Sequence, residues 1–236
     1  MATTASARSF VNMLARFPTM PGVFNPWRDV DDVVDIGPQA PKIRTANLIA
    51  YLEARRKSAR LILVGEAPGY RGCHICGIPF TSERILLGYM RPGIEPEAIF
   101  RGRKTRATRM DTPLGANKGS PELSATIAWK ALLEGQQDPW SFVFWNAFPF
   151  HPHRAETLHS NRRPSAGELL ATRDVLDQAR ALFPKRAKVV AVGRVAERAL
   201  GRLGVEAIAV RHPSQGGATK FRTQVAKLLR EGTGPR

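Results

Sequence analysis

Cysteine is scarce in this sequence: the chain has 236 residues and only two cysteines, Cys73 and Cys76, which stand in one CHIC stretch. Two cysteines cannot form the disulfide framework of a small secreted protein. A single Cys-x-x-Cys without a second pair of ligands is also a weak sign of zinc. We therefore predict two unligated thiols, no metal, no cofactor and a reducing, cytoplasmic location.

Long apolar runs and acidic residues are also scarce. No stretch approaches the roughly 20 apolar residues that a membrane-spanning helix needs, so we expect no membrane contact. Twenty Asp and Glu stand against 36 Lys and Arg, which leaves a net charge of +16. A soluble chain this basic is expected to bind a polyanion, and nucleic acid is the leading candidate. The alternative is a charge that serves solubility alone.

A hydrophobic content of 43% is enough for one core in a chain of this length. We predict one monomeric domain over residues 1–236, with an irregular N-terminal segment at 1–40 and a loose tail at 231–236. Residues 91–118 are rich in Lys, Arg, Gly and Pro, which predicts an exposed, partly mobile loop that contacts phosphates or has no partner. Four apolar residues of the first segment share one face of a short helix expected to dock on the core: Phe10, Val11, Leu14 and Phe17.

Strand and helix patterns alternate along the chain. Short apolar runs predict strands at residues 61–64, 142–145, 188–192 and 206–210. Helical patterns stand at residues 45–57, 120–135, 165–182, 195–200 and 218–229. Two of these helices have explicit start signals, namely Ser120 followed by Pro121, and a capping box of Ser165 and Glu168. The alternation predicts an α/β fold, a three-layer α/β/α sandwich around a four-stranded parallel sheet.

Polar residues follow the predicted strands at the edge where parallel sheets bind ligands. The first strand runs into GEAPG, residues 65–69, whose two glycines let backbone N–H groups approach a ligand closely. Each polar residue alone is more often a turn residue, but the fold would bring Glu66, Asn146 and His212 into one crevice. Three histidines of the loop after the second strand are expected to be surface groups or phosphate contacts: His151, His153 and His159.

Several motifs stand in a set order: GEAPG at residues 65–69 with GIPF at 77–80, NRRPS at 161–165 and HPS at 212–214. On these motifs the chain resembles the uracil-DNA glycosylase superfamily over roughly residues 59–229. The resemblance is closest to the branch with GEAPG, which carries an iron–sulfur cluster on four cysteines. Because this chain has two cysteines, we expect no cluster.

The resemblance implies a monofunctional glycosylase of base excision repair, which flips uracil out of DNA and hydrolyses its N-glycosidic bond. It assigns Glu66 and His212 as catalytic residues, Asn146 as the reader of uracil, and Phe80 as the aromatic on which the base stacks. The other substrate-binding residues that it implies are Gly65, Ala67, Pro68, Gly69, Tyr70 and Ser214.

Breaking an N-glycosidic bond leaves a cationic sugar and a uracil anion, so the site must stabilise both charges. A neutral His212 can donate to a uracil carbonyl oxygen, and Glu66 can orient water or stabilise the sugar. The Asn146 amide matches O4 and N3–H of uracil. Two alternatives stay open: a glycosylase of this fold for another deaminated base such as hypoxanthine or xanthine, and a catalytically silent protein that binds damaged or single-stranded DNA.

The chain departs from the family pattern at three places. The commonest branch has an aspartate at the position of Ala67, which leaves Glu66 as the candidate for holding the water. The acidic stretch after GEAPG is replaced, and Tyr70 is the candidate for excluding a thymine methyl group. After HPS the family often has a leucine that wedges into the duplex, but residues 215–217 are Gln-Gly-Gly here.

Overall fold

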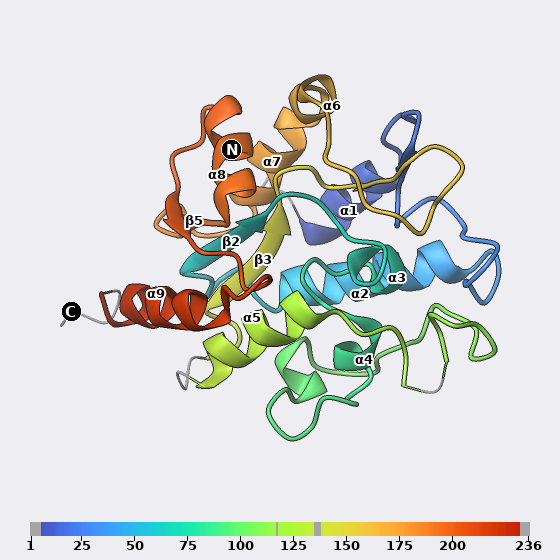
Figure 1. The fold of residues 1–236 in the computed structure, drawn as a ribbon, viewed down its shortest axis with the longest axis horizontal. Helices are drawn as coiled ribbons and strands as arrows, with labels where there is room; N and C mark the ends of the chain where they lie inside the picture. Colours follow the sequence, from blue (N-terminus) through green and yellow to red (C-terminus); the bar gives the residue numbers. More distant parts are fainter. Residues whose placement is uncertain (1–5, 117, 135–137, 232–236) are drawn as a thin grey trace.

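A parallel sheet of four strands forms the centre of the protein (Figure 1). The computed structural model describes residues 6–116, 118–134 and 138–231. In spatial order the strands are β3 (Phe142–Asn146), β2 (Leu61–Gly65), β5 (Lys188–Val192) and β6 (Ile208–Val210). A separate antiparallel ribbon pairs β1 (Val23–Phe24) with β4 (His151–Pro152). The predicted α/β fold with a four-stranded parallel sheet is confirmed.

Helices cover both faces of the sheet (Figure 1). On one side lie α1 (Ala7–Ala15), α7 (Arg173–Ala181) and α8 (Arg194–Arg202), and on the other α5 (Leu123–Glu134) and α9 (Ala218–Glu231). The short helices are α3 (Cys73–Cys76), α4 (Glu83–Leu86), α6 (Ala166–Ala171) and the 3-10 turn η1 (Pro96–Ala98). No helix among the described residues is long and apolar enough to cross a membrane.

Strand β3 shows why both faces of the sheet are apolar. Phe144 packs on Trp129 of α5, with ring centroids 5.3 Å apart, whereas Trp145 packs on Phe10 of α1 at 5.5 Å. Successive side chains of a strand point to opposite faces. An uninterrupted apolar run is therefore what a strand covered by helices on both sides requires.

Helix α2 (Ala40–Glu53) covers the open edge of β3. Tyr51 Oη accepts the Phe144 N–H at 2.7 Å, and Arg55 donates from Nε to the Phe142 carbonyl oxygen at 2.9 Å. These bonds satisfy edge groups that would otherwise stay unpaired or attract another strand. The helix predicted over residues 45–57 therefore starts and ends earlier, and Arg55 beyond it is fully buried.

Two segments differ from their predicted form. Residues 1–40 include the predicted helix, whose Phe10 is 3% exposed, but they also form β1, so the segment is more regular than expected. Residues 91–118 are not a freely exposed loop, because Ile94, Ile99 and Phe100 are buried in the core. Apolar side chains spaced between the charges anchor this segment.

Helix boundaries also shift. The capping box of Ser165 and Glu168 is confirmed, but the long helix predicted after it divides into α6 and α7 at Thr172. The Thr172 hydroxyl donates to the Glu168 carbonyl oxygen at 3.1 Å, a bond that bends helices. Helix α5 begins at Leu123 rather than Ser120. Gly135, its predicted end, and residues 232–236 of the predicted tail lie outside the described residues.

Candidate active site

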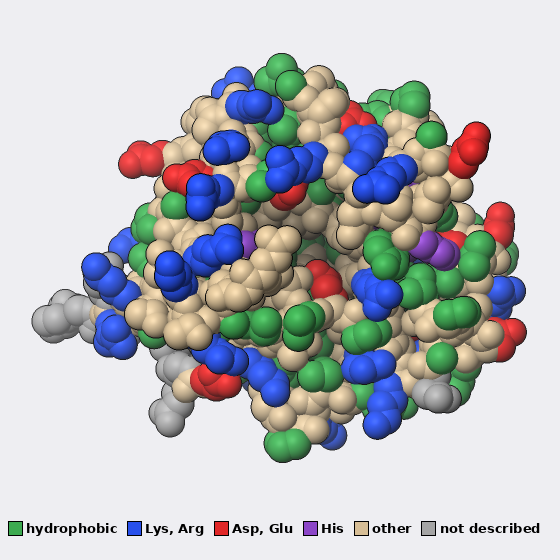
Figure 2. Space-filling view, in the orientation of Figure 1, with side chains coloured by type: hydrophobic (Ala, Val, Ile, Leu, Met, Phe, Trp, Pro, Cys, Tyr) green, Lys and Arg blue, Asp and Glu red, His purple; other side chains and the backbone are tan. Residues whose placement is uncertain are grey.

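A cavity of about 340 Å³ lies at the carboxyl ends of the parallel strands. Glu66 follows β2, Asn146 ends β3 and His212 follows β6, and all three line it. Figure 2 shows a hollow near the middle of one face with Lys and Arg side chains gathered around it. Arg163, Arg194 and Arg211 are among the residues that line the cavity.

The structure brings most of the predicted site residues together and leaves two outside. The predicted residues that line the cavity are Glu66, Ala67, Pro68, Gly69, Phe80, Asn146, His212 and Ser214. Gly65 lies beneath it instead: a Cβ there would stand 2.7 Å from Phe80 Cζ and 2.8 Å from Asn146 Oδ1. A side chain at this position would therefore displace the two groups assigned to the base.

Asn146 and Phe80 form the inner part of the cavity. Asn146 is 3% exposed, yet among the described residues its amide has no hydrogen-bond partner. Because Asn146 lines the cavity, its amide can be reached there by a ligand or by water, which would supply the missing hydrogen bonds. Phe80 stacks on Phe144 with centroids 5.0 Å apart, and its carbonyl oxygen accepts the Trp129 Nε1–H at 2.9 Å. These contacts fix the ring beside the amide.

The geometry around His212 determines its tautomer. Ser214 donates its backbone N–H to His212 Nδ1 at 3.2 Å, and the Ser214 hydroxyl lies 2.7 Å from the same nitrogen. Burial lowers the pKa of His212, and the charge of Arg211 lowers it further. The ring is therefore neutral near pH 7 and carries its proton on Nε2. Among the described residues Nε2 has no partner, so it is free to donate to a ligand.

Glu66 directly follows the last residue of β2, and its side chain is partly exposed. Burial raises the pKa of Glu66, while the nearby Arg163 guanidinium acts to lower it. The separation is 3.9 Å between Arg163 Nε and Glu66 Oε1, and the Arg163 side chain is 74% exposed. Solvent weakens a pair of this kind, so the carboxylate stays available to water or to a cationic centre.

Sequence analysis missed a second carboxyl group in the cavity wall, Glu122. Burial raises the pKa of Glu122 to about 7, and the Ser124 hydroxyl donates to its Oε1 at 3.1 Å. A Cβ on Gly72 would overlap Oε2, so the glycine lets the carboxyl group lie against the loop backbone. The sequence gives little signal for Glu122. The pattern predicts a helix from Ser120, and an acidic residue in the first turn of a helix is common.

Tyr70, the candidate for excluding a thymine methyl group, is not among the residues that line this cavity. Its backbone N–H donates to Asn161 Oδ1 at 3.1 Å, and its ring stacks against His159 with centroids 6.3 Å apart. Tyr70 lines a neighbouring cavity instead. The wall next to Gly69 is formed by Cys73 and Glu122.

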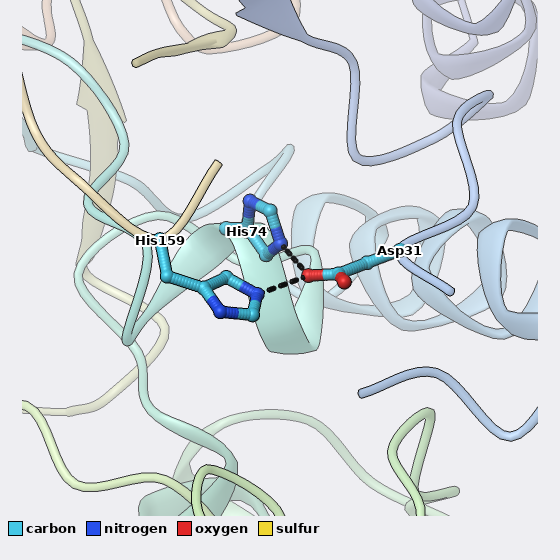
Figure 3. A group of neighbouring side chains, drawn as sticks. All are labelled: Asp31, His74 and His159. Atoms are coloured by element: carbon cyan, nitrogen blue, oxygen red, sulfur yellow. Dashed lines mark hydrogen bonds and ion pairs between the residues drawn. The ribbon is translucent and has the colours of Figure 1, made fainter. Parts of the chain in front are cut away.

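Three side chains outside the cavity form a cluster in which the buried His74 and the partly exposed His159 both point at the buried Asp31 (Figure 3). Their Nε2 atoms lie 2.8 Å and 2.7 Å from Asp31 Oδ2. Burial acts to raise the pKa of Asp31, but the two hydrogen bonds outweigh it and hold the pKa well below its usual value. Burial lowers the pKa of His74 to about 3. The neutral His74 ring thus donates to an ionised carboxylate.

The same three residues are a group that could hold a metal ion, since their ligand atoms lie within 4.8 Å of one another. A metal-bound histidine normally donates its second ring N–H to an oxygen. His74 Nδ1 is buried and has no such partner among the described residues. The cluster therefore fits a hydrogen-bonded clamp better than a metal centre.

The prediction that His151 and His159 are surface groups or phosphate contacts is wrong, because both form hydrogen bonds within the protein. His151 is fully buried, with Nδ1 2.9 Å from the Pro68 carbonyl oxygen and Nε2 3.0 Å from that of Leu158. The ribbon of β1 and β4 covers this loop, because Phe24 pairs with His151. His151 thus joins the GEAPG loop to the loop that leads to Arg163.

Both cysteines are buried and have free thiols. Burial raises the pKa of Cys73 and of Cys76, and Cys76 Sγ donates to the Thr81 carbonyl oxygen at 2.8 Å. A metal requires thiolate ligands, which this environment disfavours. That chemistry supports the expectation of unligated thiols.

Comparisons with known proteins were made for sequence and for structure. A sequence profile of the uracil DNA glycosylase superfamily matches residues 53–231. A crystal structure of wild-type Pedobacter heparinus SMUG2 is similar over 100% of both chains, with a TM-score of 0.61 and 15% sequence identity, which shows a shared fold. A search of curated protein sequences gives no match.

Proposed function

Because this chain belongs to the uracil DNA glycosylase superfamily, we propose that it hydrolyses the N-glycosidic bond of uracil in DNA. The observation that carries the proposal is the joint placement of an unpaired amide, an aromatic ring and an imidazole N–H in one cavity. Asn146, Phe80 and His212 supply these groups. Contacts within the protein hold Phe80 and His212 in place, while the Asn146 amide and His212 Nε2 remain without a partner among the described residues.

Recognition of the base uses Asn146 and Phe80. The amide N–H donates to uracil O4 and the amide oxygen accepts N3–H, a pairing that cytosine reverses at both atoms. The base stacks on Phe80, whose ring is already held by Phe144. Because the Phe80 ring is held before the base arrives, little ordering of this side chain is needed on binding.

Bond cleavage separates charge across the cavity. The C1′–N1 bond breaks with its electron pair on uracil, and His212 donates from Nε2 to the carbonyl oxygen where negative charge develops. Glu66 stabilises the positive sugar and orients the water whose oxygen bonds to C1′, and the proton that this water loses balances the charge of the departing uracil anion. The neutral state of His212 fits this role, since the step requires a hydrogen-bond donor and no proton transfer from imidazolium.

DNA is the substrate that the superfamily implies, and the base must leave the stack to reach Asn146. Unstacking costs a few kcal/mol, which contacts with phosphates can offset. The net charge of +16 and the arginines in the cavity lining suit that task. The proposal assigns the activity to one monomeric domain without metal or cofactor.

The test is a single-turnover assay on matched oligonucleotides that carry uracil, thymine, hypoxanthine or xanthine at one position. We expect free uracil and an abasic site from the uracil strand, and no release of thymine. Release of hypoxanthine or xanthine alone would mean that the substrate is another deaminated base and not uracil. If the protein binds every strand tightly but releases no base, it is a DNA-binding protein, and the proposed glycosylase activity is refuted.

A further inference from the structure

A second cavity of about 490 Å³ adjoins the candidate active site. The two share Gly69, Glu122 and Ser124 in their walls. Most of the side chains that line the second cavity alone are apolar or cationic, namely Tyr70, Met90, Pro121, Leu123, Arg71 and Arg84, and two are neutral and polar, Thr126 and Asn161. Whatever enters the first cavity as part of a chain therefore has this surface beside it.

Leu123 has no explanation in the packing of the protein. It is the first residue of α5 and is 73% exposed, so it contributes little buried area to folding. Tyr70, in contrast, lines the second cavity and is held by its neighbours. Arg71 Nε donates to Tyr70 Oη at 2.9 Å, and its guanidinium carbon lies 5.4 Å from the ring centroid. The site thus presents a held aromatic ring and an exposed aliphatic side chain.

Aromatic and apolar side chains interleaved with arginines are the chemistry that binds single-stranded nucleic acid, because bases contact the former and phosphates the latter. Arg71 and Arg84 offset the one acid of the shared wall, Glu122. Adjacent nucleotides are joined by one phosphate, so the neighbour of a flipped nucleotide has to emerge beside the first cavity.

We propose that the second cavity binds the unstacked nucleobase next to the target on the same DNA strand. This assignment rests on the proposed glycosylase function and extends it: the enzyme contacts a dinucleotide unit, the target and one neighbouring base. Met90, Leu123 and Tyr70 contact the flanking base, whereas Arg71 and Arg84 face its phosphates.

The test uses short single-stranded oligonucleotides with one uracil, in which either neighbour is replaced by a tetrahydrofuran abasic residue that keeps the phosphate spacing. We expect removal of the base on one side to reduce single-turnover kcat/KM by roughly 5- to 150-fold, the range for one stacked base. Removal on the other side should change the rate little. No uracil release from any strand would refute the proposed function itself, whereas release at equal rates from all three would refute the flanking site alone.

Variants locate the effect. Leu123→Ala and Tyr70→Ala should lower the rate on the intact strand and abolish the difference between intact and flank-abasic strands, while Tyr70→Phe should retain it. Leu170→Ala is the matched control, since Leu170 is also exposed, at 59%, but lines neither cavity. If Leu123→Ala and Tyr70→Ala keep the full flank dependence, the second cavity does not hold the neighbouring base.

Discussion

Polar groups in the cavity and polar groups around Arg44 differ in whether they have partners within the protein. Arg44 and Asp35 are fully buried and paired, with Nη1 and Oδ1 2.7 Å apart. In the cavity, the Asn146 amide and His212 Nε2 lack partners among the described residues. Paired groups serve the fold, while unpaired groups that line a cavity indicate where a ligand binds. Substitutions in the two regions should therefore affect different properties.

The largest expected effect is on stability, from Arg44→Ala. Removing the guanidinium leaves the Asp35 carboxyl group buried without its ionic partner, which typically costs about 3–5 kcal/mol. Urea denaturation of the variant and the wild type would measure it. Arg180→Ala is the control, because Arg180 pairs with Asp177 on the surface and should cost under about 1 kcal/mol. An equal loss of stability in Arg44→Ala and Arg180→Ala would contradict a special role of the buried pair.

His212→Ala should reverse that pattern, with lost catalysis and retained binding. Removing one donor to a developing oxyanion typically costs about 2.7–4 kcal/mol of transition-state stabilisation. Single-turnover rates on a uracil oligonucleotide would measure the loss, and affinity for a duplex with an abasic site would show that binding is kept. An unchanged rate would remove His212 from the mechanism.

The two regions also differ in how far the sequence could predict them. Glu66, Asn146 and His212 could be placed together because parallel strands end at one edge, and that edge follows from hydrophobic patterning. The pairing of Arg44 with Asp35 and the clamp on Asp31 depend on how irregular segments fold back, which no periodicity encodes. Glu122 and Leu123 were missed for the same reason, since they stand where a loop becomes a helix.

Glu122 gives a test that depends on pH. Its pKa of about 7 in the folded protein is above the ordinary value of about 4.3 in an unfolded chain. The folded state therefore retains a proton that the unfolded state loses, and stability falls as pH rises from about 4 to 7, by up to about 3 kcal/mol. Glu122→Gln should gain stability relative to the wild type between about pH 5 and pH 8 in urea denaturation. If the stability of the wild type and of Glu122→Gln changes with pH in the same way, the pKa of Glu122 is not raised in the folded protein.

The most direct test of the account concerns Asn146, whose unpaired amide is assigned to the base. Asn146→Asp replaces the amide donor with an acceptor for the cytosine N4 amino group and, when protonated, can donate to N3. We expect slower uracil release, the appearance of cytosine release, and a change in their ratio of roughly one to two orders of magnitude. Asn12→Asp is the control, because it adds the same charge at an exposed position of α1 that lines neither cavity, and it should leave the ratio unchanged.

The deciding measurement is the ratio of single-turnover rates on matched uracil and cytosine oligonucleotides for the wild type and Asn146→Asp. The account predicts that the ratio shifts toward cytosine in Asn146→Asp alone. An unchanged ratio with an intact uracil rate would mean that Asn146 does not read the base.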